Sequence, residues 1–291
     1  MKTKLIDYVD NGPIFITGHV NPDGDALGSA FALKLFLDSQ SIISDVDFDI
    51  TTKLPSNLNH LPYHLISDDL KEKYNTVFVF DCGNSSRLGK YEEVVLAAEN
   101  VVVIDHHVDP SFGDVQIIDP HAASTTQVLF RQFKDENIEI NEEMANCLLT
   151  GLITDTGRFQ YSNTTSEVFS IAAELLGNGA NLSKISENIY GSIEFNALTL
   201  QSKIIERIVL NEDLQFAHSI VFQNDYKDYQ VEPEETDFLI DVVRLVKEST
   251  VALLIKEQED GSFKGSLRSR GDIDVQKIAS IFGGGGHVAA S

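Results

Sequence analysis

Three short apolar segments of this sequence end in aspartate or histidine side chains. The segments and the residues that follow them are 13–17 before His19, 76–80 before Asp81, and 101–104 before Asp105-His106-His107. Runs of this length and composition are typical of buried parallel strands, and ligands collect beyond the carboxyl ends of such strands. Buried charges need partners. We therefore expect these side chains to gather around positive charge, most simply around divalent metal ions.

The first segment leads into a loop that carries two more carboxylates, Asp23 and Asp25. Because one small residue separates them, both side chains can face one centre in a loop. The structural alternative is that Asp23 forms a turn and Asp25 caps the helix that the apolar residues of 26–37 predict. With His19 and a strand before them, we favour metal binding.

The other candidate site residues also have structural alternatives to a role in metal or substrate binding. In an extended backbone the side chains of His106 and His107 alternate, so one imidazole can bind metal while the other faces a substrate phosphate. Asp105 either fixes a histidine tautomer or takes part directly. Asp155, after an apolar helix, adds a fourth carboxylate. Simple turn or cap roles for Asp81 and Asp155, and a surface turn for the histidine pair, remain open.

Together these residues form a ligand set that suits two metal ions. The set is His19, Asp23, Asp25, Asp81, His106 and Asp155. Two ions about 3.5 to 4 Å apart can activate a water molecule and bind the oxygens of a phosphoryl group. Mixed carboxylate and imidazole ligation favours manganese over zinc or calcium. The sequence therefore predicts phosphoester hydrolysis.

Near its end the sequence offers residues that could hold a substrate. They are Arg268, Ser269, Gly284, Gly285, Gly286 and His287. Arginine presents a planar fork to phosphate, and successive glycine amides can form an anion-binding nest. The alternatives are a solvated hairpin arm for the arginine and a flexible tail for the glycines.

Charge and cysteine content restrict the class of protein. The formal net charge is −23, from 22 basic and 45 acidic residues, which argues against binding of long nucleic acid. The segment 251–291 is balanced, with five basic and five acidic residues, so a short anionic substrate could bind there. Two cysteines, no signal peptide and no apolar run approaching about 18 residues predict a cytoplasmic protein away from the membrane.

The pattern along the chain predicts two α/β domains. Strand-like segments at 13–17, 42–48, 76–80, 101–104 and 115–118 alternate with helical ones, which predicts a parallel five-stranded sheet covered by helices. Ser124 and Asn141 are expected N-caps. Residues 165–206 are helical in pattern, and the Gly177-Asn178-Gly179 segment is expected to end a helix.

Strand patterns return in the last part of the chain, at 214–222 and 251–256, with a hairpin signal at Asp260-Gly261. Helices at 234–247 and 275–282 complete a smaller α/β domain with a mixed sheet. The predicted organisation is a catalytic domain at 1–185, a helical connector at 186–210 and a substrate-binding domain at 211–291.

With these motifs assembled, the chain resembles the DHH phosphoesterase superfamily with the DHH-associated C-terminal domain. The motifs that carry the resemblance are Gly18-His19-x-x-Pro22-Asp23-Gly24-Asp25-Ala26, Asp81, Asp105-His106-His107, Asp155, and the glycine run that ends at His287. The resemblance covers nearly the whole chain. It is strongest to the nano-RNase group, which combines oligoribonuclease activity with dephosphorylation of adenosine 3′,5′-bisphosphate (pAp).

The resemblance implies a role for each site residue. One manganese ion would be bound by His19, Asp23 and Asp81, and the other by Asp25, Asp81, His106 and Asp155, with Asp81 shared. His107 would contact the scissile phosphate or protonate the leaving group. Arg268 and His287 would bind the far end of the substrate. Such proteins continue past the glycine run, so we expect sequence beyond Ser291.

The expected function is manganese-dependent hydrolysis of short oligoribonucleotides, including dinucleotides such as pApA, and conversion of pAp to AMP, with a cleft between the domains selecting small substrates. A homodimer is one expected assembly. The alternatives are a phosphodiesterase for cyclic di-AMP or its product pApA, and a non-catalytic nucleotide-binding module, which predicts no turnover. RecJ-like exonucleases and family II pyrophosphatases are less suitable, because they carry other domains beside the shared motifs.

Overall fold

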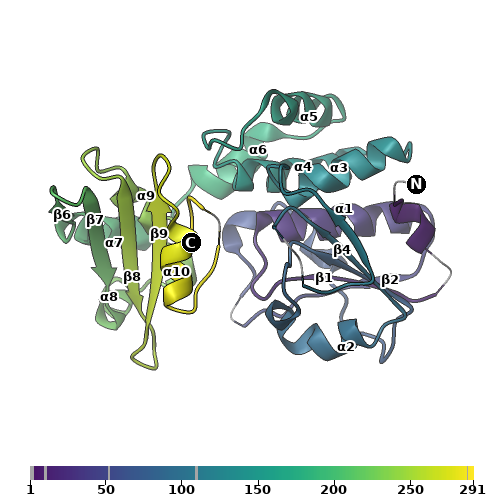
Figure 1. Cartoon of the computed structure of the whole chain (residues 1–291), viewed down its shortest axis with the longest axis horizontal. Coiled ribbons are helices and arrows are strands. Elements are labelled where there is room, and N and C mark those ends of the chain that lie inside the picture. Colours follow the sequence, from purple (N-terminus) through teal and green to yellow (C-terminus); the bar gives the residue numbers. More distant parts are fainter. Residues whose placement is uncertain (1–2, 10–11, 52, 109–110, 287) are drawn as a thin grey trace. The chain divides into compact units, whose positions relative to one another are not determined.

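The computed structural model describes residues 3–9, 12–51, 53–108, 111–286 and 288–291. The chain divides into two compact units, Met1–Ser192 and Ile193–Ser291 (Figure 1). None of the described helices is long and apolar enough to cross a lipid bilayer.

The first unit is built on a sheet of five strands in the order β2-β1-β3-β4-β5. The strands are β1 (Ile14–Gly18), β2 (Ser44–Val46), β3 (Thr76–Phe80), β4 (Asn100–Asp105) and β5 (Val115–Ile118). All neighbouring pairs run parallel. The predicted parallel five-stranded sheet is therefore confirmed. At the edge, β2 is shorter than the strand expected at 42–48.

Helices cover both faces of this sheet (Figure 1). On one face lie α1 (Gly24–Ser39), α3 (Thr125–Asp135) and α4 (Glu142–Asp155). On the other lie α2 (Glu92–Leu96) and the 3-10 segment η4 (Ser85–Tyr91), whose Leu88 and Tyr91 pack in the core of that face. Alternate strand residues supply the two cores, because successive side chains point to opposite faces. Ile16 and Phe78 pack in the first core, whereas Phe15 and Val77 pack in the second. Burial on both faces explains the continuous apolar runs.

Several short elements complete the first unit. The remaining helices are α5 (Ser166–Gly177), α6 (Leu182–Ser186) and a π-helical turn, η5 (Glu187–Gly191), and the 3-10 turns are η1 (Leu5–Tyr8), η2 (Ser56–Leu58) and η3 (Tyr63–Leu65). The helix expected to stop in the Gly177-Asn178-Gly179 segment ends there as α5.

Side-chain caps set the start of the three helices that pack beside the site. Ser124 accepts a hydrogen bond from the amide of Gln127 at α3, and Asn141 caps α4 in the same way, so both predicted N-caps are confirmed. Asp23, two residues before Asp25, is the N-cap of α1, and its Oδ1 accepts from the amide of Asp25 at 2.9 Å. The helix consequently begins at Gly24, earlier than the apolar pattern indicated.

The second unit has a four-stranded sheet in the order β6-β7-β8-β9. The elements are α7 (Phe195–Glu206), β6 (Val209–Asn211), β7 (Phe216–Val221), α8 (Gln223–Tyr229), α9 (Leu239–Arg244), β8 (Val251–Glu257), β9 (Phe263–Ser269) and α10 (Val275–Ile281). The central pair is parallel and the outer pairs are antiparallel, which confirms a mixed sheet. Helix α7, from the segment predicted as a connector, packs in the core of this unit through Ala197, Leu200 and Ile204.

One predicted helix of this unit is wrong in extent. The pattern indicated a helix over 234–247, but the structure has a 3-10 turn, η6 (Pro233–Thr236), followed by the short α9. The guanidinium of Arg270 donates to the carbonyl of Arg244 and, at 3.3 Å, to that of Val246. These bonds satisfy carbonyl groups at the end of α9 from a different strand loop, so the helix stops where the local sequence does not require it.

Candidate metal centre

The carboxyl ends of β1, β3 and β4 and the adjoining ends of α1 and α4 bring the predicted ligands together. In each of three groups of side chains, the ligand atoms all lie within 4.8 Å of one another. The groups are His19 with Asp23 and Asp81, Asp25 with His106 and Asp155, and Asp81 with Asp105, His106 and His107. The structure therefore gathers the side chains of all six predicted metal ligands, which come from positions 19 to 155 of the chain.

The first group lies beyond β1. The Nε2 atom of His19 is 3.6 Å from Oδ2 of Asp81 and 4.0 Å from Oδ1 of Asp23. The other ring nitrogen, Nδ1, is 2.9 Å from the carbonyl of Val20 and donates to it. In the neutral imidazole this bond leaves the lone pair on Nε2, the nitrogen that faces the carboxylates.

The second group lies between β4 and the end of α4. The Nε2 atom of His106 is 3.2 Å from Oδ2 of Asp155 and 3.9 Å from Oδ2 of Asp25. Its Nδ1 is 3.2 Å from the carbonyl of Ala122. Both histidines thus use a backbone carbonyl to fix the tautomer in which Nε2 can bind a metal ion.

Asp81 faces both groups. Its Oδ2 is directed at His19, while Oδ1 lies 3.6 Å from Nε2 of His106. The backbone of Asp81 has φ of +54°, a conformation that is uncommon for a residue with a side chain and that turns the chain sharply after β3. The hydroxyl of Thr125 donates to Oδ1 at 3.2 Å. One carboxylate is thereby placed with one oxygen toward each ligand group.

Asp25 belongs to the first turn of α1, and its side chain is directed at the start of α3. The residue is fully buried, with a relative exposure of 0%. Its two oxygens accept hydrogen bonds from the amides of Thr125 and Thr126, at 2.6 and 2.9 Å. The sequence offered helix capping as an alternative to metal binding for this residue. In the structure Asp25 caps α3, a different helix from the one expected, and it also faces His106, so capping does not remove it from the group of candidate ligands.

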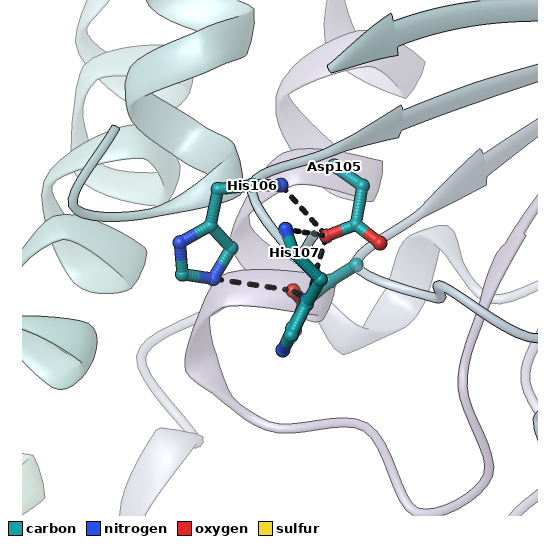
Figure 2. Close-up of side chains that lie close together, drawn as sticks. Asp105, His106 and His107 are labelled. Carbon is teal, nitrogen blue, oxygen red and sulfur yellow. Dashed lines mark hydrogen bonds and ion pairs between the residues drawn. The ribbon is translucent and has the colours of Figure 1, made fainter. Parts of the chain in front are cut away.

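Asp105 holds the histidine pair in place. Its Oδ1 accepts hydrogen bonds from the amides of His106 and His107, at 2.7 and 3.0 Å, and from Nδ1 of His107 at 2.7 Å. Figure 2 shows this carboxylate turned back toward the two histidines, whose rings point in different directions. The ring planes are inclined by 63° and the centroids are 4.8 Å apart. This arrangement favours the orienting role for Asp105.

Electrostatics couples these groups. Burial lowers the pKa of His107, but its hydrogen bonds to Asp105 and Asp81 outweigh burial and raise the pKa to about 11. Burial, followed by the charges of Asp155 and Asp81, raises the pKa of Asp25 well above its ordinary range. Burial also raises the pKa of Asp155, to about 6. For Asp81, burial is outweighed by hydrogen bonds to His107 and His19, which lower its pKa.

These shifts share one cause: the cluster packs carboxylates together and needs positive charge among them. Protonated histidines supply that charge when no cation is bound. Divalent metal ions would replace those protons, because carboxylate and neutral imidazole are the ligand forms that they require. Mixed oxygen and nitrogen donors in two groups with a shared carboxylate fit a pair of such ions.

Two residues near the site carried no signal in the sequence. Thr125, which bonds Asp81, follows the predicted cap Ser124, but a threonine at a helix start is common for local reasons. Arg87 lies six residues beyond Asp81 in η4, and its charge influences His19. Only the packing of η4 against the loop after β1 brings Arg87 near the ligands, and no local motif predicts that contact.

The predicted substrate-binding residues lie in the second unit. Arg268 in β9 donates from Nη1 to the carbonyl of Leu267 at 2.9 Å, and the hydroxyl of the buried Ser269 donates to the carbonyl of Ile273 at 2.7 Å. Gly284, Gly285 and Gly286 are exposed, and His287 lies outside the described residues. Their role toward substrate stays a prediction.

Comparison with known proteins now identifies the class. Residues 13–152 match the DHH family N-terminal domain, and residues 213–291 match the DHHA1 domain. The two matches include five of the six predicted metal ligands and the glycine run, whereas Asp155 lies three residues past the end of the first match. The chain belongs to the DHH family and is a phosphoesterase, that is, a hydrolase.

Individual proteins that this chain resembles add detail to the family assignment. The chain is 33% identical to the bifunctional oligoribonuclease and PAP phosphatase NrnA of Thermus thermophilus, over 96% of this chain and 83% of the relative. It is 25% identical to the cyclic-di-AMP phosphodiesterase GdpP of Geobacillus thermodenitrificans, over 95% of this chain but 44% of that longer protein. The crystal structure of an exopolyphosphatase-related protein from Bacteroides fragilis matches with a TM-score of 0.91 and 26% identity, over 98% of this chain and 88% of the other.

Proposed function

We propose that this chain is a manganese-dependent phosphoesterase that uses two metal ions to convert pAp to AMP and to hydrolyse short oligoribonucleotides, including dinucleotides. The observation that carries the proposal is the placement of Asp81, with one carboxylate oxygen toward each group of ligands. The similarity to a bifunctional oligoribonuclease and PAP phosphatase supports the choice of substrates.

In this proposal His19, Asp23 and Asp81 would hold one ion, and Asp25, Asp81, His106 and Asp155 would hold the other. The ions would supply an activated water molecule and neutralise charge on the phosphoryl oxygens. Hard carboxylate oxygens dominate both groups, and each group has one imidazole. This donor set supports manganese, which accepts both ligand types.

The remaining side chains act on the proton and on the substrate. Asp105 accepts the hydrogen bond from Nδ1 of His107 at 2.7 Å, which fixes the ring and favours its protonated form. The oxygen of a water molecule that has already lost one proton to solvent forms the new bond to phosphorus, as the bond to the leaving oxygen breaks. His107 gives the proton from Nε2 to that leaving oxygen, as a general acid.

Substrate size is the other part of the proposal. A net charge of −23 repels a long polyanion, whereas a mononucleotide or dinucleotide places only a few charges against the protein. The balanced charge of 251–291 supports Arg268, Ser269, the glycine run and His287 as contacts to the part of the substrate away from the reacting phosphate. The homodimer and the cytoplasmic location stay predictions.

A second candidate is hydrolysis of cyclic di-AMP or of its linear product pApA. It is supported by the similarity to GdpP over 95% of this chain. The same metal centre would serve, because both reactions hydrolyse a phosphodiester or phosphomonoester bond at a nucleotide.

A substrate panel tests the proposal. The manganese-loaded protein is incubated with pAp, the dinucleotide pApA, a ten-nucleotide RNA and cyclic di-AMP, and the products are separated by chromatography. We expect turnover of pAp and pApA, slower cleavage of the ten-mer and the least turnover of cyclic di-AMP. Fast hydrolysis of the ten-mer without the dinucleotide would contradict size selection. Cyclic di-AMP as the best substrate would favour the second candidate, and no turnover at all would favour a non-catalytic binding module.

A further inference from the structure

Arg87 lies against the loop that carries the first ligand group. Its carbonyl accepts a hydrogen bond of 2.7 Å from the amide of Val20, the residue after His19. This bond holds the backbone of η4 against the loop after β1, between the ligands His19 and Asp23. Arg87 therefore belongs to a segment that packs directly beside the loop of the first ligand group.

The guanidinium of Arg87 is exposed, and within the described ranges no hydrogen bond or ion pair of this side chain is found. Lys90, three residues further along η4, shows the contrast, because its ammonium lies 3.5 Å from Asp47 and 4.7 Å from the ring centre of Tyr91. The ammonium of Lys90 thus has partners within the fold, whereas Arg87 is exposed next to the loop that carries His19.

A phosphoryl group bound in this centre adds negative charge where the ligands are already acidic. A guanidinium offers two parallel N–H donors in a plane that matches two oxygens of a phosphate, and it stays charged at every working pH. Donors aimed at charge that develops during the reaction are often the largest single contribution to catalysis.

We propose that Arg87 is a catalytic residue that binds the non-bridging oxygens of the reacting phosphoryl group on the His19 side of the metal centre. This inference rests on the proposed function and adds a residue to it. Arg87 makes no bond to phosphorus and transfers no proton. It stabilises the charge on the oxygens while the water attacks and the leaving oxygen departs.

The test compares Arg87→Ala and Arg87→Lys with the matched control Lys90→Ala, which removes a cation from the same segment. The substrates are pAp and bis(p-nitrophenyl) phosphate, which has a single phosphate, so a contact to any second phosphate cannot affect it. We expect Arg87→Ala to lower kcat by about 100-fold with both substrates. Arg87→Lys should recover only part of the activity, because an ammonium lacks the planar fork.

Two further readouts exclude a purely structural role. Manganese affinity, measured by isothermal titration calorimetry, is expected to be the same in Arg87→Ala and the wild type. Added guanidinium ion is expected to restore part of the activity of Arg87→Ala and none of the small loss in Lys90→Ala.

Four results would overturn the inference. They are equal activity of Arg87→Ala and Lys90→Ala, a raised KM with unchanged kcat, loss of manganese binding in Arg87→Ala, and no rescue by guanidinium. A wild-type protein that turns over none of the substrates would instead overturn the proposed function, and this inference with it, so the two failures are told apart by the wild-type rate.

Discussion

At the scale of single residues, the site depends on how backbone geometry aims a few carboxylates. Asp81 ends a strand whose side chains alternate between two buried cores, and its φ of +54° takes it out of that alternation. Both of its oxygens can then face ligand groups instead of a core. Asp25 reaches the same place from α1 because the amides at the start of α3 hold its oxygens.

Crowded carboxylates make the metal-free site costly in stability. The pKa of Asp155 in the folded protein is about 6, above the ordinary carboxyl value. The protonated form is therefore favoured in the fold, and the free energy of unfolding decreases as the pH rises from about 4 through about 6. In the metal-free protein we expect Asp155→Asn to increase the free energy of unfolding at pH 7 by on the order of 1 to 2 kcal/mol.

Urea denaturation with a chelator present, between pH 5 and pH 7.5, measures this effect. The difference between Asp155→Asn and wild type is expected to shrink as the pH falls, because the wild-type carboxyl then becomes protonated. Glu139→Gln, which removes an exposed carboxylate, is the control and should change stability little. If Asp155→Asn were less stable than wild type at pH 7, the charge of Asp155 would not be destabilising in the folded protein.

The role of His107 as a general acid gives a prediction that depends on the leaving group. We expect His107→Ala to lower kcat for pApA by about 100-fold or more, since a ribose oxygen needs a proton as it leaves. With bis(p-nitrophenyl) phosphate the loss should be much smaller, because p-nitrophenolate leaves without a proton. Steady-state kinetics with both substrates checks this. Equal losses would assign His107 to binding of the phosphate instead.

At the scale of elements, close packing of α1 against α4 brings Asp25 and Asp155 together. A Cβ atom built on Gly28 would lie 2.4 Å from the carbonyl oxygen of Cys147, and one on Gly151 would lie 2.6 Å from Oδ1 of Asp25. Neither position can carry a side chain without moving a helix backbone or a candidate ligand. The two glycines therefore set how near the ends of these helices can approach.

We expect Gly28→Ala to destabilise the protein by about 1 to 3 kcal/mol, because the added methyl group meets a backbone carbonyl that cannot rotate away. Gly177→Ala, at the end of α5, is the matched control, since a Cβ atom there meets nothing within 4 Å. It should leave stability unchanged or raise it slightly. Urea denaturation of both variants measures the difference. A neutral Gly28→Ala would mean that the α1–α4 contact is adjustable.

The elements show where local sequence is informative. The strands β3 and β5 begin and end where the apolar runs do, and the caps Ser124 and Asn141 are correct, because burial and capping are local requirements. The three-residue strand β6 was missed, as it is too short to show an alternating pattern. The helix expected at 234–247 is cut short by Arg270, a contact from another strand loop.

The candidate site likewise contains residues that the local sequence predicts and residues that only tertiary packing brings there. The sequence predicted that its six candidate ligands lie together because five of them follow strand ends, Asp155 ends an apolar helix, and all six match known motifs. Their pairing through the two oxygens of Asp81 was expected only from the family resemblance. Thr125 and Arg87 were missed because their contacts arise when α3 and η4 pack beside the ligands. Such contacts depend on tertiary structure and leave no spacing to recognise.

At the scale of the whole molecule, the protein consists of two compact units and carries a large negative net charge. The family matches cover a part of each unit, 13–152 in the first and 213–291 in the second. The excess of acidic residues lies outside 251–291. Cations are therefore central to the account, because without them an anionic substrate would meet a negatively charged site.

The most direct test is anomalous diffraction at the manganese absorption edge from crystals grown with manganese. The account predicts two anomalous peaks about 3.5 to 4 Å apart, one beside His19 and one beside His106, with an oxygen of Asp81 on each. The Asp81→Asn variant should lose at least one of them. A single peak, peaks away from these residues, or two unchanged peaks in Asp81→Asn would contradict the shared metal centre.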